Sequence, residues 1–127
     1  MIFRDTIVLL CGVGLYASAF MYRKSRRAAR GELAEPSVVQ TPNARALGGV
    51  SNALVGLAYY AALACATHFF EARPVWLAAF AASVAAAAFS CFLAYSLAFV
   101  TRMPCAYCWT SHIINWTLPF FVWMARP

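Results

Sequence analysis

Charged side chains are scarce in this sequence, and four long stretches lack them altogether. Only 11% of the 127 residues are charged, whereas 64% are hydrophobic, and the mean hydropathy is +0.69. A soluble domain usually carries charge on about a quarter of its residues, because its surface must be solvated. The composition therefore excludes an ordinary water-soluble fold and favours a chain that is surrounded by lipid.

The uncharged stretches predict the fold class. They cover residues 6–22, 46–70, 74–101 and 103–125. A membrane-spanning helix needs about 20 apolar residues, and runs this long and unbroken do not suit barrel strands. We therefore predict an all-α, four-transmembrane-helix bundle that forms one integral membrane domain over 1–127, in contact with membrane lipid. The expected segments are helices at about 5–22, 49–70, 75–101 and 104–124, and a basic connection over 23–47.

Acidic residues are the scarcest charged type, so the net charge is +6, from ten basic and four acidic side chains. Half of the basic residues follow the first uncharged stretch, at Arg23, Lys24, Arg26, Arg27 and Arg30. Such clusters contact lipid head groups or set membrane topology. We expect no nucleic-acid partner, because the short connections cannot build a folded basic module. The first stretch also resembles a signal peptide, but we expect no cleavage, since the basic cluster would then begin the mature chain.

The same charges make a prediction about orientation. An even number of crossings places the 23–47 connection and the turn at 101–104 on one side of the membrane. Seven of the ten basic residues lie on that side. By the positive-inside rule alone, this side would face the cytoplasm.

Five cysteines are present, and two of them form a motif. The other three lie singly in apolar stretches, where packing is the expected role, at Cys11, Cys65 and Cys91. Cys105 and Cys108 form a C-x-x-C motif directly after Pro104, a residue favoured at the first position of a helix. This spacing brings both sulfurs to one face of a first helical turn, where a disulfide can close and where the helix dipole favours a thiolate. The motif therefore favours a redox-active pair.

Two alternatives to a redox pair remain at this stage. Zinc needs about four ligands, and His112 is the one further candidate nearby, so we expect no metal. A structural role for two reduced cysteines stays open, because C-x-x-C is a short pattern.

Polar residues continue along the helix face that carries the motif. Ser111, His112 and Asn115 follow Cys108 at helical spacing, and the expected second helix carries a comparable stripe at Asn52, Gly56, Tyr59 and Tyr60. Polar side chains inside a membrane span normally face a cavity, a ligand or a partner helix. Amide, phenol and imidazole groups beside a dithiol suit a quinone, whose oxygens develop negative charge on reduction. Hydrogen bonds between helices are the alternative for any one of these residues.

Two segments resemble the vitamin K epoxide reductase (VKOR) family. They are residues 103–115 (MPCAYCWTSHIIN) and 51–60 (SNALVGLAYY), and the match in helix order and motif position covers nearly the whole chain. Family members are four-helix membrane bundles whose C-x-x-C motif exchanges two electrons with a bound quinone. The resemblance implies that Cys108 reacts with the quinone and that Cys105 exchanges with another thiol. It also implies that the pocket contains Asn52 as a quinone-binding residue, Tyr59 and Tyr60 as aromatic residues, and His112 where the animal enzymes have a tyrosine.

One family feature is missing. Family enzymes carry two further cysteines after the first helix, which relay electrons from a thioredoxin-like protein. The second belongs to a pattern like Cys-x-x-Val-x-x-Ser-Pro, and the corresponding residues here are Glu35, Val38, Thr41 and Pro42. No cysteine occurs between Cys11 and Cys65, so the relay is excluded.

Two functions follow as alternatives. The first is a VKOR-like membrane thiol oxidoreductase, in which a thioredoxin-like thiol protein acts in trans directly on Cys105. The second is a noncatalytic subunit of a larger respiratory or photosynthetic membrane complex. The resemblance also implies an extracytoplasmic redox pair in a bacterial inner membrane, contrary to the charge count. We expect the family orientation, because related proteins expose a basic stretch there too.

Overall fold

The fold is entirely helical in the residues that the computed structural model describes, which are 1–33, 38–40, 42 and 49–127. Four α-helices account for most of them: α1 (Ile2–Ala29), α2 (Asn52–Ala66), α3 (Arg73–Tyr95) and α4 (Ala106–Met124). Short helical segments are η1 (Val38–Gln40), η3 (Thr67–Phe69) and η4 (Ser96–Thr101). The described residues contain no β-strand, so the all-α prediction and the four-helix arrangement are confirmed.

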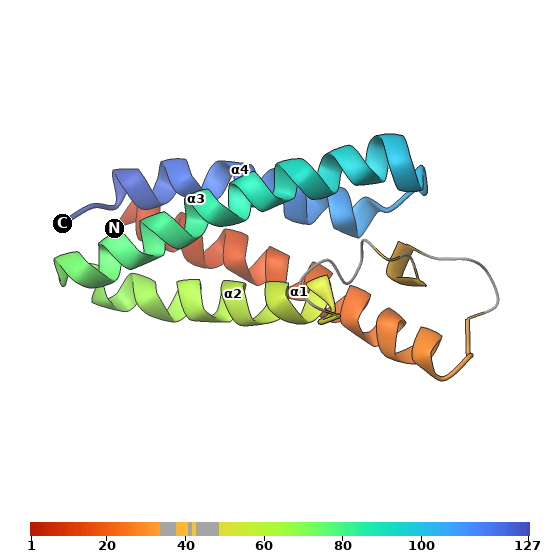
Figure 1. Ribbon diagram of the computed structural model, residues 1–127. Helices are drawn as coiled ribbons and strands as arrows, with labels where there is room; N and C mark the ends of the chain where they lie inside the picture. The colour runs from red at the N-terminus through yellow and green to blue at the C-terminus, as the bar shows by residue number, and fades with distance from the viewer. Residues whose placement is uncertain (34–37, 41, 43–48) are drawn as a thin grey trace.

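The four helices form a bundle that is open on one side. Helix α1 packs against α2 and α4, and α4 packs against α3, whereas α2 and α3 touch little beyond the turn that joins them. Both chain termini and the α2–α3 turn lie at one end of the bundle (Figure 1). The C-terminal part of α1 and the α3–α4 connection lie at the other end, which we call the motif end because the C-x-x-C motif is there.

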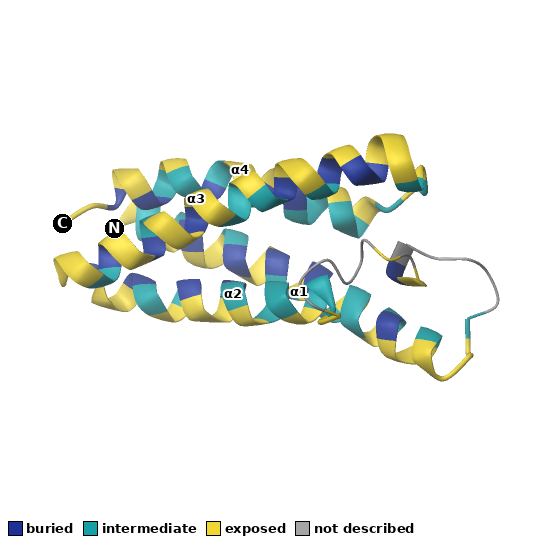
Figure 2. Cartoon of the chain, viewed as in Figure 1, coloured by how far each residue is buried: buried dark blue, intermediate teal, exposed yellow. Residues whose placement is uncertain are grey.

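The core is narrow, and the outside is strongly apolar. Fully buried side chains meet along the bundle axis, among them Ile7, Cys11, Tyr60, Leu118 and Val122. Large apolar side chains are exposed around the outside, where Figure 2 shows the outward faces of the helices in yellow, and they include Leu9, Val13, Phe92, Ile113 and Phe120. An apolar surface this extensive fits lipid better than water.

Two of the helical segments are long and apolar enough to cross a membrane, Ile2–Ala29 and Arg73–Thr101. Helix α2 has 15 residues and α4 has 19. The second helix is therefore shorter than the predicted 49–70, because the chain tightens into η3 after Ala66. That all four helices cross the membrane stays a prediction.

The first helix is longer than we predicted. It continues through the basic cluster to Ala29, whereas we expected a connection from residue 23 onward. Arginine, lysine and alanine are strong helix formers, and the cluster contains no helix breaker. The helix ends before Gly31, whose φ of +71° suits glycine. Much of the remaining predicted connection, including Glu35 and Thr41, lies outside the described residues.

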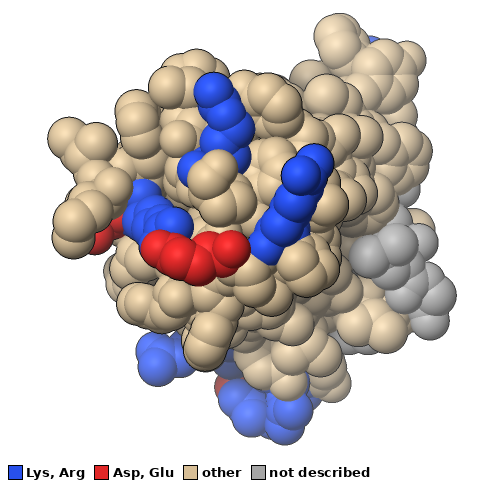
Figure 3. Space-filling view, turned by 90° about the vertical axis from the view of Figure 1, so that its left-hand side faces the viewer, with Lys and Arg blue, Asp and Glu red and all other residues tan. Residues whose placement is uncertain are grey.

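The end that carries the termini is held together by an ion pair. Figure 3 looks onto this end and shows basic and acidic side chains gathered on it. Arg4 of α1 lies 2.9 Å from the Glu71 carboxylate in the turn before α3. The hydrogen bond from Arg4 holds the pKa of the Glu71 carboxyl below its usual range. This pair ties the first helix to the α2–α3 turn.

Candidate functional site

The C-x-x-C motif forms a disulfide at the start of α4. Cys105 and Cys108 are bonded, with their Cα atoms 5.3 Å apart. Cys105 is the N-cap of α4, and its Sγ accepts a hydrogen bond of 3.2 Å from the Cys108 backbone N–H. The motif therefore lies where the first N–H groups of a helix favour negative charge on sulfur.

One detail of the prediction is wrong. We placed Pro104 at the first position of the helix and both cysteines in its first turn. The helix begins at Ala106, because Cys105 has an extended backbone with φ of −153°. Pro104 therefore belongs to the preceding connection, and Cys105 caps the helix that carries Cys108.

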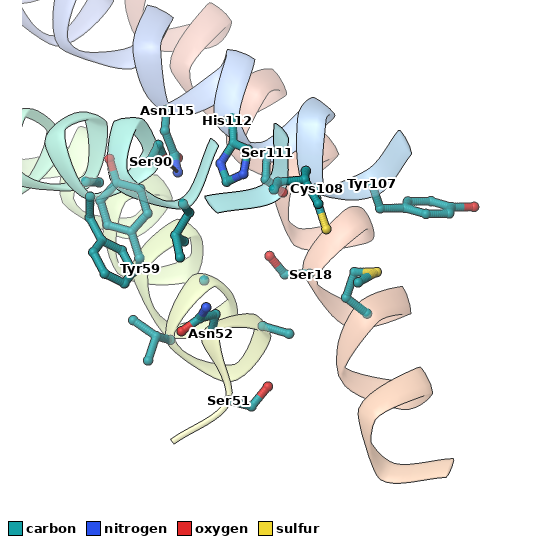
Figure 4. Close-up of a pocket in the computed structure, with 18 of the residues that line it drawn as sticks. Ser18, Ser51, Asn52, Tyr59, Ser90, Tyr107, Cys108, Ser111, His112 and Asn115 are labelled. Carbon is teal, nitrogen blue, oxygen red and sulfur yellow. Dashed lines mark hydrogen bonds between the residues drawn. The ribbon is translucent and has the colours of Figure 1, made fainter. Parts of the chain in front are cut away.

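A cavity of about 460 Å³ lies beside the disulfide, with walls from all four helices. Figure 4 shows Cys108 and His112 on α4 across the cavity from Asn52 and Tyr59 on α2, with Ser18 of α1 on a third wall. Small-molecule sites typically occupy about 300–1,000 Å³. Cys108 lines the cavity, whereas Cys105 is not among its lining residues. The two sulfurs therefore have different surroundings.

The residues predicted as quinone-binding all line this one cavity. They are Asn52, Tyr59, Tyr60, Ser111, His112 and Asn115. Asn52 is the first residue of α2, so it sits near the motif end, whereas Asn115 is about two turns deeper on α4 than Cys108. The structure thus brings residues from two distant segments of the sequence to one site.

Two polar atoms in the cavity wall are buried without a partner. Among the described residues, none forms a hydrogen bond with Tyr59 Oη or His112 Nδ1. The His112 ring lies between Trp109 and Trp116, with ring centroids 5.9 and 6.2 Å away. Burying a polar atom without a hydrogen bond is unfavourable, so such atoms in a cavity wall point to a polar ligand.

Two other predicted site residues use their polar atoms within the bundle. Tyr60 Oη donates a hydrogen bond of 2.7 Å to Asn115 Oδ1, and Asn115 Nδ2 donates one of 2.7 Å to Ser90 Oγ. This chain joins α2, α4 and α3 across the deep end of the cavity. Tyr60 and Asn115 therefore form a fixed wall.

Sequence reasoning missed several serines of the site, including one on α1 and one on α3 that are almost fully buried. Ser18 of α1 and Ser90 of α3 are buried and line the cavity. A Cβ added at Gly56 would lie 2.7 Å from Ser18 Oγ, so α1 and α2 approach closely beside the cavity. A signal was present, because a polar residue in an uncharged span usually faces the bundle interior.

Comparison with known proteins identifies the family. No curated protein matches the chain. Residues 6–123, nearly the whole chain, match the vitamin K epoxide reductase family, whose members are integral membrane proteins with thiol oxidoreductase activity. Family members generally use a quinone. On this match, which includes the C-x-x-C disulfide and every lining residue named above, the chain belongs to the vitamin K epoxide reductase family.

Proposed function

We propose that this protein transfers two electrons between a thiol substrate and a membrane quinone through Cys105 and Cys108. One observation carries the proposal: Cys108 lines a cavity whose wall contains two buried polar atoms, Tyr59 Oη and His112 Nδ1, that form no hydrogen bond with any described residue. Cys105 is not among the lining residues and caps the start of α4. This difference supports a reaction of Cys108 with the quinone and of Cys105 with the thiol.

The cavity suits a flat, lipid-soluble ring with polar edges. Its wall is mostly apolar, which favours a ring that partitions into the bilayer. Tyr59 and His112 provide groups that can hydrogen-bond to carbonyl oxygens, and Asn52 provides an amide on the α2 wall. Helices α2 and α3 pack only sparsely against each other, so a quinone would enter from the lipid between them.

The thiol half of the reaction begins at Cys105. A substrate thiolate attacks Cys105 Sγ, the bond to Cys108 breaks, and the electron pair of that bond leaves on Cys108. Cys108 lies in the first turn of α4, where the positive end of the helix dipole favours the new thiolate. A second substrate thiolate then displaces Cys105, which completes the substrate disulfide and leaves both cysteines reduced.

The quinone half of the reaction regenerates the disulfide. A bound quinone accepts two electrons and two protons and becomes a quinol. Tyr59 and His112 would orient its carbonyl oxygens and stabilise the negative charge that develops on them. Cys108 is the sulfur on the cavity wall, so it is the one that can reach the ring.

Steady-state turnover tests the proposal. Purified protein should reduce a short-chain benzoquinone at the expense of dithiothreitol, well above the uncatalysed rate. Cys108→Ala should abolish this activity. Cys91→Ala is the matched control, because Cys91 is an exposed, unbonded cysteine of α3 outside the cavity lining. Full activity in Cys108→Ala, or none in the unmodified protein, would refute the proposal.

The alternative of a noncatalytic subunit stays a prediction. It requires a stoichiometric complex that survives mild detergent purification and that also forms with Cys105→Ser. A monomer that turns over quinone would exclude it.

A further inference from the structure

The last two turns of α1 present a cluster of positive charge at the motif end. There α1 extends past the start of α2 and diverges from the end of α3 (Figure 1). We call this cluster the basic collar; it consists of Arg23, Lys24, Arg26, Arg27 and Arg30. The four arginines are exposed and the lysine is half-buried. Four of its residues lie in α1 and Arg30 is the C-cap, so the collar has a defined position relative to the bundle.

The collar begins beside the disulfide. Met21 Sδ of α1 lies 4.0 Å from Cys105 Sγ. One residue earlier, the Phe20 ring stacks on Tyr107, with ring centroids 4.0 Å apart. Arg26 lies five residues after Met21, which is roughly 8 Å along the helix axis. This separation is comparable to the Debye length at physiological salt. The field of the collar therefore reaches Cys105.

Little negative charge compensates the collar. Glu32 pairs with Arg30 at 2.9 Å and lies 4.0 Å from Arg27. Within the described part of the chain, no acidic side chain forms an ion pair with Arg23, Lys24 or Arg26. Among the described residues, the motif end carries six basic residues and one acidic residue, whereas the opposite end carries three and two. The approach to Cys105 is therefore positively charged.

We propose that the thiol that exchanges with Cys105 carries negative charge next to its sulfur, and that the basic collar selects it. This inference rests on the proposed thiol exchange and adds the charge class of the substrate. A field of this kind raises the encounter rate of an oppositely charged reactant by about 10-fold to 1,000-fold at low salt. It also favours the thiolate form of the attacking thiol.

The substrate thiol must reach Cys105 directly, so the charge around Cys105 affects which thiols react. The chain has no cysteine between Cys11 and Cys65 that could relay electrons, so the substrate sulfur must itself reach Cys105. In that step the substrate S–Cys105 bond forms and the Cys105–Cys108 bond breaks, with the electron pair passing to Cys108. A second thiolate then releases Cys105, so two thiols become one disulfide and the protein disulfide becomes a dithiol. Each attacking species is an anion that passes the collar.

Matched small thiols test the charge class without any quinone. The probes are 2-mercaptoethanesulfonate (anionic), 2-mercaptoethanol (neutral) and cysteamine (cationic), each applied to the oxidised full-length protein in a nonionic detergent. The readout is the rate of Cys105–Cys108 reduction, from alkylation and mass spectrometry, expressed per thiolate. At about 20 mM salt we expect the anionic probe to exceed the cationic one by about ten-fold, and at about 500 mM salt the rates should converge.

Substitutions in the basic collar test whether it causes the preference for anionic thiols. Arg23→Gln combined with Lys24→Gln and Arg26→Gln should remove the preference, whereas Arg73→Gln with Arg126→Gln, at the opposite end of the bundle, should keep it. Helical circular dichroism and an intact disulfide establish that each variant is folded. Equal rates for the three probes in the unmodified protein would overturn the proposal, even if quinone turnover is observed. A lack of quinone turnover with the preference intact would instead refute the proposed function alone.

Two further comparisons identify the source of the charge. We would compare a cysteine peptide flanked by glutamates with one flanked by lysines. If the ratio of their rates exceeds the ratio seen with small thiols, the substrate is an acidic protein surface. If the two ratios are equal, the substrate is a small anionic thiol. The collar could instead contact anionic lipid. If the collar variant keeps the preference for anionic thiols but loses binding to phosphatidylglycerol vesicles, the collar is a lipid site and the proposal is wrong.

Discussion

At the scale of single residues, the site depends on which polar atoms the protein uses and which it leaves for a ligand. Tyr59 and Tyr60 are adjacent in the sequence and both line the cavity. Tyr60 Oη is bonded to Asn115, whereas Tyr59 Oη is buried without a partner among the described residues. Adjacent tyrosines thus have different roles, one structural and one available for binding.

Replacing tyrosine with phenylalanine should therefore have different effects at Tyr59 and at Tyr60. Tyr60→Phe leaves Asn115 Oδ1 without its donor, so we expect a loss of about 1–3 kcal/mol in the free energy of unfolding. Tyr59→Phe removes a hydroxyl that forms no hydrogen bond with a described residue, so stability should hold while the KM for quinone rises several-fold. Thermal unfolding in detergent and quinone kinetics measure the two effects. Equal destabilisation by both substitutions would contradict this assignment.

At the scale of helices, α1 and α2 approach so closely that Gly14 of α1 has no room for a side chain. A Cβ at Gly14 would lie 2.6 Å from the Tyr60 ring, which is fully buried. Gly14→Ala should therefore destabilise the bundle by about 1–3 kcal/mol. Gly12→Ala is the matched control, because nothing lies within 4 Å of the added methyl group, and it should be neutral or slightly stabilising. The measurement is thermal unfolding of both variants, and the account fails if they behave alike.

The ion pair between α1 and the α2–α3 turn predicts a pH dependence. The folded pKa of Glu71 is lowered by Arg4, so the contribution of the pair is present above the unfolded pKa of about 4.3 and is lost as pH falls through the lower folded pKa. Glu71→Gln should lower the melting temperature slightly at neutral pH and not at acidic pH. Added salt should shrink the difference, because the carboxylate is exposed. Asp5→Asn is the control, and a constant gap between unmodified protein and Glu71→Gln across pH would contradict the assignment.

The sequence predicts a helix well where hydrophobicity determines its position. It predicts a helix end poorly where the local backbone geometry determines that end. The four uncharged stretches predicted the four α-helices, and the C-x-x-C spacing predicted the disulfide. The end of α1 was missed because a basic, helix-forming segment resembles a connection when only charge is considered. The N-cap position of Cys105 was missed because it depends on one extended residue. The bonds of Tyr60 and Asn115 depend on helix packing, which a single sequence does not contain.

At the scale of the whole molecule, charge and family resemblance disagree about orientation. Six of the nine basic residues that the structure describes lie at the motif end, yet we expect this end to be extracytoplasmic. If the collar serves an anionic thiol, positive charge there has a function independent of topology. After reduction, Cys105 and Cys108 should therefore react with a membrane-impermeant maleimide in intact spheroplasts, in a variant with Cys11, Cys65 and Cys91 replaced by alanine. Labelling only after lysis would place the pair in the cytoplasm.

The central claim is that Cys108 passes electrons from the protein to a quinone bound in the cavity. A single-turnover experiment tests it most directly: prereduced protein, freed of excess reductant and kept anaerobic, is mixed with excess short-chain benzoquinone, and quinol formation and disulfide formation are followed together. We predict one quinol and one Cys105–Cys108 disulfide per protein molecule, and neither product with Cys108→Ala. Quinol formation without the disulfide, or disulfide formation without quinol, would contradict the account.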